Sequence, residues 1–291
     1  MSDGFLVIDK PSGITSHDVV AQMRKVFETK RVGHAGTLDP MATGVLVLGI
    51  NNGTKLLQYI TEGKKRYLAT IKLGASTITD DKEGEITNIA ADAEIAAITD
   101  SAVRESLEAM VGLIMQRPSS VSAIKVDGKR AYDRVRDGEV VELPAREVRI
   151  YSLEILKISR SGGGIEIDID VACSAGTYIR AIARDLGDLL KVGGHLTSLR
   201  RSEVAPFLIN EALALNSVSP ANLLNVVEVA KRILPSREID LAEKNELKFG
   251  RALSASEFSG VGIAITSDNE LCALIENRNS GAQPIAVFVK E

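Results

Sequence analysis

The sequence is poor in residues that mark several common classes of protein. It contains two cysteines, three histidines and no tryptophan, and aromatic residues make up only 4% of its 291 positions. Cys173 and Cys272 are far apart and have no CxxC partner, which disfavours a disulfide framework or a zinc ribbon. His17, His34 and His195 lack the spacing of metal ligands. We therefore expect two buried thiols in a reducing cytoplasm, and no metal.

Long hydrophobic runs are missing too. No stretch of about eighteen uncharged apolar residues occurs, so we expect no membrane span. The N-terminus, MSDGFLVIDKPSG, lacks the basic and long apolar regions of a signal peptide. The whole chain is 45% hydrophobic and 25% charged, which is the composition of a soluble globular protein. A chain of 291 residues favours one large domain and one small domain.

Acidic residues outnumber basic ones, and the formal net charge is −4. The excess is uneven, because the first 72 residues contain ten Lys or Arg and six Asp or Glu, whereas the rest contains 25 and 33. One basic face on an acidic body would suffice to bind a folded RNA. Chance variation of surface charge would produce the same asymmetry, so it carries little weight alone.

Hydrophobic periodicity predicts strands interrupted by helices without strict alternation. GVLVLGI is short and apolar, as in a buried strand, and KKRYLATIKLG alternates. Ser16 is a plausible N-cap for a helix that follows it. The acidic, alanine-rich stretch 79–98 has the character of a solvated excursion. These patterns predict an α+β fold with a mixed sheet, and a composition shift near LPSREID predicts a short β-rich tail.

The segment GHAGTLDPMATG, residues 33–44, holds a single carboxylate, Asp39. Pro40 pushes the backbone of Asp39 towards extended geometry, and the glycines permit close approach of a ligand. A turn carboxylate that bonds its own backbone is the more common situation for Leu-Asp-Pro alone. The longer segment, followed by a strand that looks buried, could present one acid in one geometry.

Four segments, GHAGTLDPMATGVL, KRYLATIKLG, CSAGTYIRAIARDLG and HLTSLRR, resemble in content and order the TruB family, the bacterial tRNA pseudouridine-55 synthases. The resemblance runs from about Gly4 to Phe207. It implies isomerisation of uridine to pseudouridine in the T-loop of tRNA, by base flipping and without metal or cofactor. It also implies a mixed, largely antiparallel sheet flanked by helices, an inserted thumb at about 117–147, and a cytoplasmic monomer.

The tail from about Leu234 resembles the family's small β-barrel RNA-binding domain only loosely, closest to the divergent actinobacterial type. We accordingly predict a catalytic domain at 1–233 and a PUA-like RNA-binding domain at 234–291.

The resemblance also assigns roles to single residues. Asp39 matches the essential aspartate, Arg180 the arginine that pairs with it, and Tyr67 the tyrosine that stacks on the target base. Tyr178 and Leu199 match positions that line the uracil pocket.

The resemblance assigns His34 the space that the flipped uridine leaves, and Lys10 a motif beside the catalytic loop that could touch RNA. Asp81 matches an acidic position that looks distant from the chemistry. A solvated helical arginine, a core tyrosine and a loop histidine are the ordinary alternatives for Arg180, Tyr67 and His34.

The chain departs from the family pattern at the predicted thumb. Ser119 replaces the second of two prolines and Val121 replaces a tyrosine, whereas Gly128, Lys129 and Tyr132 match. The docking of the thumb is therefore open, although the catalytic assignment does not depend on it.

Two other functions compete with this interpretation. A hydrolase that uses Asp39 would require a second carboxylate or a metal. A non-catalytic RNA-folding protein would use the same surface without chemistry.

Overall fold

The structure is a computed structural model, and it describes residues 3–119, 125–126, 129–130, 143–161, 164–278 and 281–289. The chain forms two compact units. Unit 1 contains Met1–Asp39, Val45–Glu62 and Ala205–Glu291, and unit 2 contains Pro40–Gly44 and Gly63–Val204. Neither unit is a continuous piece of chain. The predicted domains at 1–233 and 234–291 divide the residues differently and remain predictions.

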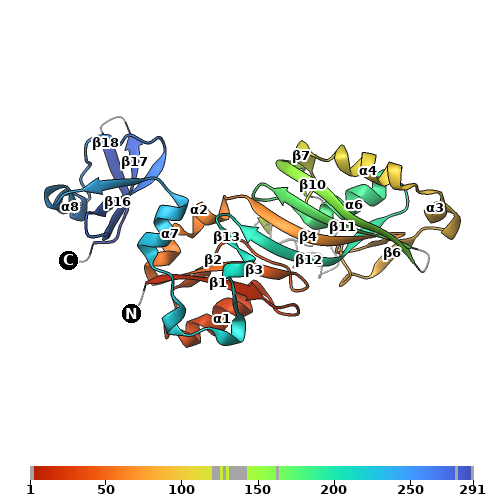
Figure 1. Cartoon of the computed structure of the whole chain (residues 1–291), viewed down its shortest axis with the longest axis horizontal. Coiled ribbons are helices and arrows are strands. Elements are labelled where there is room, and N and C mark those ends of the chain that lie inside the picture. The colour runs from red at the N-terminus through yellow and green to blue at the C-terminus, as the bar shows by residue number, and fades with distance from the viewer. Residues whose placement is uncertain are drawn as a thin grey trace. The chain divides into compact units, whose positions relative to one another are not determined.

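Unit 2 is built on a sheet of long antiparallel strands (Figure 1). Its strand order is β12, β4, β11, β10 and β7, with bounds Gly194–Val204, Lys65–Leu73, Gly164–Cys173, Arg146–Ser161 and Gly112–Gln116. The first two residues of β3 (Thr43–Ile50) pair in parallel with Arg200 and Arg201 of β12. The expectation of a mixed, largely antiparallel sheet is therefore confirmed.

Side chains alternate along these strands as the sequence predicts. In β4, Tyr67, Ala69 and Ile71 are buried, whereas Arg66 and Leu68 between them are exposed. Helix α6 (Ile179–Leu189) packs on β4 and β12, and α4 (Asp100–Glu108) packs on β10 and α6. The apolar face of the sheet is thus covered by helices.

The other elements of unit 2 are short. They are β5 (Ala75–Thr77), β6 (Ile86–Ile89), α3 (Asp92–Ala97), β8 (Lys125–Val126) and β9 (Lys129–Arg130). β5 pairs with β6, and β8 pairs with β9. Of the two altered thumb positions, Ser119 is buried and Val121 lies outside the described residues, as do the matching positions Gly128 and Tyr132.

Unit 1 begins with β1 (Gly4–Lys10), α1 (Ser16–Val26), β2 (Val32–His34) and the main part of β3. β1 and β3 are neighbours, β2 pairs antiparallel with β3, and β14 (Leu213–Ala214) lies parallel to β1. Apolar residues of α1 pack on these strands around Leu6, Leu46 and Leu48. The intervening short elements are η1 (Asn51–Leu56), α2 (Leu57–Thr61), β13 (Phe207–Leu208), η2 (Ile209–Glu211), η3 (Leu215–Ser217) and η4 (Pro220–Asn222).

The predicted β-rich tail forms a four-stranded sheet with a core of its own. Its strands are β15 (Ser236–Ile239), β16 (Val261–Thr266), β17 (Leu271–Arg278) and β18 (Gly281–Val287), and they pair in that order (Figure 1). Helices α7 (Val226–Ile233) and α8 (Leu241–Lys248) precede and interrupt it. Ile239, Leu247, Cys272 and Ile275 are buried within it.

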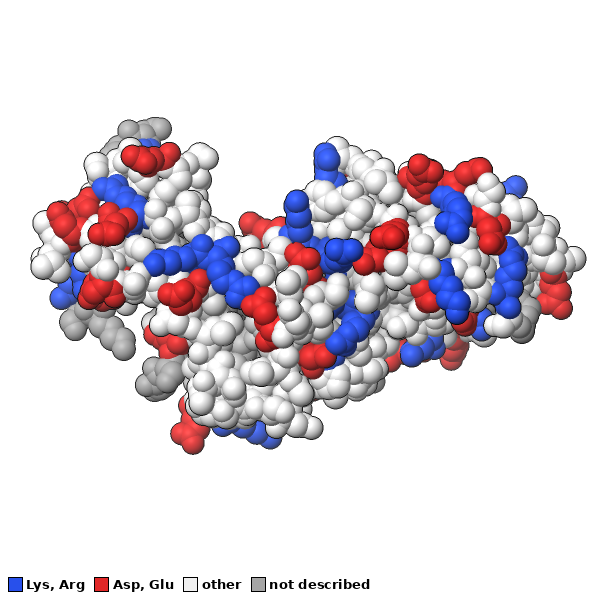
Figure 2. All heavy atoms as spheres, viewed as in Figure 1, with Lys and Arg blue, Asp and Glu red and all other residues white. Residues whose placement is uncertain are grey.

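The face of the molecule in Figure 2 shows basic and acidic side chains interspersed on both units. No extended area of a single sign appears among the described residues on that face. Over the part of the chain that the structure describes, every helix is too short or too polar to cross a membrane.

Candidate active site

Asp39 follows a backbone segment that is held in place by a side chain of α1. The backbone N–H of Leu38 donates to Ser16 Oγ at 2.8 Å, and Ser16 Oγ donates to the Leu38 carbonyl at 3.2 Å. Both residues are buried. Asp39 itself is half-buried. A buried hydroxyl therefore fixes the peptide that immediately precedes the proposed nucleophile.

Ser16 was expected to cap α1, and this expectation is wrong. Thr15 is the N-cap: its hydroxyl accepts from the Asp18 N–H, and the Asp18 carboxylate accepts from the Thr15 N–H in return. Ser16 lies one position further on, where its side chain turns inward to the Leu38 peptide. The local signal for Thr15 is the acid three residues later, Asp18, which completes a capping box, whereas Ser16 has Val19 at the equivalent position.

The residues after Asp39 belong to unit 2, where β12 holds them. Arg200 Nη1 donates to Thr43 Oγ1 at 3.2 Å, and Gly44 pairs with Arg201. Gly44 has φ +103°, and a Cβ atom there would lie 2.1 Å from the Arg201 carbonyl oxygen. Only glycine fits this position. The segment that carries Asp39 is therefore anchored by Ser16 on its N-terminal side and by β12 on its C-terminal side.

Two further predicted residues lie in unit 1. His34 ends β2, pairs with Leu48 of β3 and is half-buried. Lys10 is completely buried, and its Nζ donates to the carbonyls of Pro11 and Ile14 at 2.9 and 2.7 Å. A buried ammonium group that binds carbonyls of its own turn stabilises the shape of that turn. A contact between Lys10 and RNA stays a prediction.

Tyr67 and Leu199 lie on one face of the unit 2 sheet. Leu199 of β12 pairs with Ala69, and Arg201 pairs with Tyr67. Leu199 and Tyr67 are therefore diagonal neighbours on adjacent strands, a separation within reach of an aromatic ring. Both are nearly buried, with 7% and 8% of their surface exposed, on the face that α6 covers. The structure brings these two predicted residues together.

Arg180, in the first turn of α6, makes a buried ion pair with Asp81. Its Nη1 lies 3.2 Å from Asp81 Oδ2 and donates to the Thr79 carbonyl at 2.8 Å. The two side chains are 5% and 4% exposed. Asp81 Oδ1 in turn accepts from Thr79 Oγ1 and the Glu83 N–H. Each charge is thus compensated where water is excluded, as buried charges require.

This ion pair changes the picture of Asp81, which looked distant from the chemistry in the sequence but contacts Arg180, a predicted site residue, directly. The stretch 79–98 was expected to be solvated, and most of its residues are exposed. Asp80 and Asp81 are exceptions, with 8% and 3% of their surface exposed. The partners of the ion pair, Asp81 and Arg180, are 99 residues apart in sequence. Local composition carries no signal for a pair so far apart in sequence.

Tyr178 directly precedes α6 and is held through its backbone by Gln116, the last residue of β7. Gln116 Nε2 donates to the Tyr178 carbonyl at 3.0 Å, and the Tyr178 N–H donates to Gln116 Oε1 at 2.8 Å. The Arg146 guanidinium lies 5.0 Å from the centre of the Tyr178 ring. Sequence reasoning missed Gln116, because a single glutamine at the end of a strand carries no local signal.

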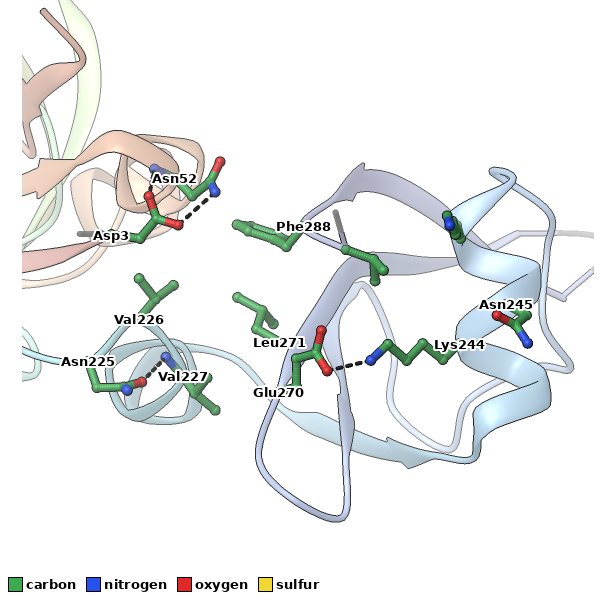
Figure 3. Close-up of a pocket in the computed structure, with 12 residues that line it drawn as sticks. Asp3, Asn52, Asn225, Val226, Val227, Lys244, Asn245, Glu270, Leu271 and Phe288 are labelled. Atoms are coloured by element: carbon green, nitrogen blue, oxygen red, sulfur yellow. Dashed lines mark hydrogen bonds and ion pairs between the residues drawn. The ribbon is translucent and has the colours of Figure 1, made fainter. Parts of the chain in front are cut away.

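A cavity of about 580 Å³ lies in unit 1 and is drawn in Figure 3. Asp3 accepts two hydrogen bonds from Asn52 at its edge, and Lys244 pairs with Glu270 (Figure 3). None of the predicted site residues lines it. In the described residues, no group of three or more His, Cys, Asp or Glu side chains is arranged to hold a metal ion.

Comparison with known proteins gives consistent matches along the chain. The model of the TruB family pseudouridylate synthase N-terminal domain matches residues 24–179. The models of the tRNA pseudouridylate synthase B C-terminal domain and of the tRNA pseudouridine synthase II C terminus match 180–236 and 234–289.

Curated relatives are similar over nearly their whole length. The tRNA pseudouridine synthase B of Arthrobacter sp. (strain FB24) is 47% identical over 300 residues, which cover 99% of this chain and 97% of that protein. The protein of the same name from Corynebacterium efficiens is 49% identical over 290 residues, with 99% and 96% covered.

Solved structures share the fold at lower identity. A chain of an H/ACA RNP bound to a substrate RNA containing 2′-deoxyuridine aligns with a TM-score of 0.72 at 22% identity, covering 99% of this chain and 85% of that one. A Cbf5-Nop10-Gar1 complex gives 0.70 at 24% identity, with 99% and 84% covered. The family models and the curated relatives together show that the chain belongs to the TruB family of pseudouridylate synthases.

Proposed function

We propose that this chain isomerises uridine 55, in the T-loop of tRNA, to pseudouridine, with Asp39 as the nucleophile and without a cofactor. The observation that carries the proposal is the presentation of Asp39. One carboxylate follows a peptide fixed by Ser16 and precedes a segment anchored on β12. The relatives named tRNA pseudouridine synthase B support tRNA as the substrate. We expect the enzyme to work as a monomer in the cytoplasm.

The reaction needs one carboxylate because it is an isomerisation. The N1–C1′ bond breaks and a C5–C1′ bond forms, while the proton leaves C5 and N1 gains one. Asp39 can support this by covalent attack at C1′ of the sugar or at C6 of the ring. The base must leave the stack before either attack. Both routes end with Asp39 released as a carboxylate.

The other residues serve this step in the proposal. Tyr67 stacks on the flipped base, and Tyr178 and Leu199 line its pocket. His34 occupies the space that the uridine vacates, which lowers the cost of unstacking. Arg180 holds the Asp39 carboxylate ionised and aimed.

The test uses a T-arm stem-loop that carries tritium at C5 of the target uridine. Isomerisation releases this tritium to water, hydrolysis of the same glycosidic bond releases free uracil, and a pure RNA-folding protein releases neither. Wild-type enzyme should release tritium, and Asp39→Asn should bind the RNA with wild-type Kd and release none. Measurable product from the purified variant would remove Asp39 from its role.

Arg180→Lys separates charge from geometry in the same assay. Lysine keeps the positive charge but lacks the planar fork of donors that a carboxylate can accept in two places. We expect single-turnover rates far below wild type with RNA binding retained. Wild-type turnover in Arg180→Lys would make Arg180 a structural residue of the buried ion pair with Asp81 alone.

A further inference from the structure

A second ion pair lies beside the one that holds Arg180. Arg184 Nη1 lies 3.1 Å from Asp80 Oδ2, and Arg180 Nη1 lies 3.2 Å from Asp81 Oδ2. The arginines are four residues apart on α6, so they lie on the same side of the helix. The aspartates are consecutive in the chain. Two adjacent carboxylates therefore bind two successive turns of α6.

The backbone of Asp80 makes this arrangement possible. Asp80 has φ +59°, in the left-handed region. Consecutive side chains on an extended strand point to opposite faces, and the left-handed residue interrupts that alternation. The Leu196 N–H of β12 donates to the Asp80 carbonyl at 3.0 Å, and the Lys82 N–H donates to the Leu196 carbonyl at 2.8 Å. The loop is therefore tied to β12 by its backbone and to α6 by its two carboxylates.

Arg184 connects a third segment to this loop. Its Nη2 donates to the Arg117 carbonyl at 2.8 Å and to Asp185 Oδ1 at 2.7 Å. Arg117 follows β7, one residue after the glutamine that holds the backbone of Tyr178. One guanidinium thus joins the 79–84 loop, the end of β7 and α6.

We propose that Asp80 and Arg184 are positioning residues for pseudouridine formation, which keep Asp81 in contact with Arg180 and thereby set the direction of the Arg180 guanidinium. This inference rests on the proposed function, in which Arg180 holds the catalytic carboxylate. Asp80 and Arg184 act through Asp81 and the loop and do not touch the substrate.

The ion pair between Arg184 and Asp80 is partly buried, so we expect its contribution to holding the loop to be sensitive to substitution. The side chains of Arg184 and Asp80 are 22% and 11% exposed. Burial raises the pKa of Asp80, and the charges of Arg184 and Arg180 oppose that rise. Loss of the Asp80 carboxylate leaves Arg184 bound to the Arg117 carbonyl and Asp185 but no longer to the loop. Asp81 would then be held only by the backbone bonds of the loop and by its own partners.

The left-handed backbone decides which substitutions are informative. Asp80→Gly removes the carboxylate, and glycine adopts φ +59° without strain. Asp80→Asn keeps an acceptor oxygen, and asparagine also tolerates this region. Asp100→Asn is the control, because Asp100 pairs with Arg160 at 2.7 Å on the surface, where both side chains are roughly half exposed.

The measurements are the single-turnover rate at saturating T-arm RNA, the Kd for that RNA and the melting temperature. We expect Asp80→Gly to lower the rate about tenfold or more, since small misplacements of a catalytic group have effects of this size. The Kd should stay at the wild-type value. Asp80→Asn should recover part of the rate, and Asp100→Asn should match wild type.

A double-mutant cycle distinguishes positioning from general stability. If Asp80 acts through Asp81, Asp80→Gly should lower the rate strongly in the wild-type background and have little further effect in Asp81→Asn. Equal effects in both backgrounds would overturn the inference. So would a wild-type rate for folded Asp80→Gly, or a loss explained by Kd alone. If Asp80→Gly fails to fold, Asp80→Asn and Arg184→Lys decide by the same criteria.

The same experiment separates the inference from the proposed function. A wild-type enzyme without tritium release from T-arm RNA would refute the function and the inference that rests on it. An active wild-type enzyme whose rate is unaffected by Asp80→Gly would refute the inference alone.

Discussion

Ser16 shows how a single hydroxyl can hold the segment of a proposed nucleophile, Asp39, 23 positions away in sequence. It binds both the backbone N–H and the carbonyl of the buried Leu38, so that the chain reaches Asp39 in one conformation. Buried backbone groups are almost always paired, and here the pairing is supplied by one side chain.

Ser16→Ala should weaken both stability and catalysis. The substitution leaves a buried N–H and a buried carbonyl without the partner that they have now, a loss of about 1–3 kcal/mol in the free energy of unfolding. The turnover rate should fall as well, because the Asp39 segment loses its N-terminal anchor. Urea unfolding and single-turnover assays measure the two effects. Ser101→Ala, in the exposed first turn of α4, is the matched control and should change neither. A stable, fully active Ser16→Ala enzyme would refute the anchor.

Because of the buried thiol of Cys173, we expect the free energy of unfolding to fall at alkaline pH. Burial raises the pKa of its thiol from 9.0 to about 11. The folded-state pKa lies above the unfolded one, so the thiol's contribution to stability is complete below pH 9.0 and is lost as the pH rises towards about 11. Stability should fall in this interval, and less steeply in Cys173→Ala, although that variant is less stable at neutral pH. Urea unfolding of both proteins at several pH values measures the difference, and equal slopes would contradict the prediction.

Labelling checks the same environment independently. Cys173 and Cys272 are both buried reduced thiols. A thiol reagent at neutral pH should modify neither in the folded protein and both after denaturation.

At the scale of elements, the alternating sequence of β4 determines which of its side chains lie on each face of the sheet. Its period of two places Tyr67 on the face under α6 and Arg66 on the other, where Arg66 Nε lies 2.7 Å from Asp170 Oδ1. A shift of one residue would exchange these faces. The position of Tyr67 next to Leu199 therefore follows from strand register.

Substitutions of Tyr67 test whether this register serves catalysis. Tyr67→Phe keeps the ring face and should bind RNA and turn over nearly as wild type, whereas Tyr67→Leu loses stacking and should be severely impaired. Single-turnover rates and RNA Kd values for both variants give the comparison. The exposed Leu68→Ala on the same strand is a control and should have little effect. If both Tyr67 variants are as active as wild type, Tyr67 is only a core residue.

The sequence predicts those elements whose signal is local. Alternation identifies β4 and β11, and the apolar run identifies β3, because burial of one or both faces repeats within a few residues. The Asp39 segment is identifiable because its glycines and proline are specific. Asp81, Gln116 and Ser16 were missed or misassigned, since each acts on a partner at least 22 residues away. Periodicity contains no information on such pairs.

At the scale of the whole molecule, the last sheet is the part best separated from the proposed chemistry. β15 to β18 and α8 enclose their own core, and none of the predicted site residues lies in them. Lys55 Nζ donates to the Val287 carbonyl and lies 4.6 Å from the centre of the Phe288 ring. These contacts would be lost on removal of the tail without change to the Asp39 segment.

Truncation after Leu234 should therefore affect binding of large substrates more than chemistry. We expect a higher KM for full-length tRNA and nearly unchanged kcat on an isolated T-arm stem-loop. Circular dichroism and thermal melting establish that the shortened chain is folded. A folded truncated enzyme without turnover on the stem-loop would show that the tail takes part in building the active site.

The interleaving of the two units has a consequence for synthesis on the ribosome. Chains emerge from the N-terminus, yet unit 1 needs residues from Ala205 onward, and Gly44 pairs with Arg201 of β12. The segment next to Asp39 therefore cannot be anchored until more than half of the chain has been made. Most of unit 2 is the continuous segment Gly63–Val204, which can begin to fold first. Nascent chains should thus protect β4, β11 and β12 from protease before the residues around Asp39, and the proposed nucleophile should become competent only late in translation.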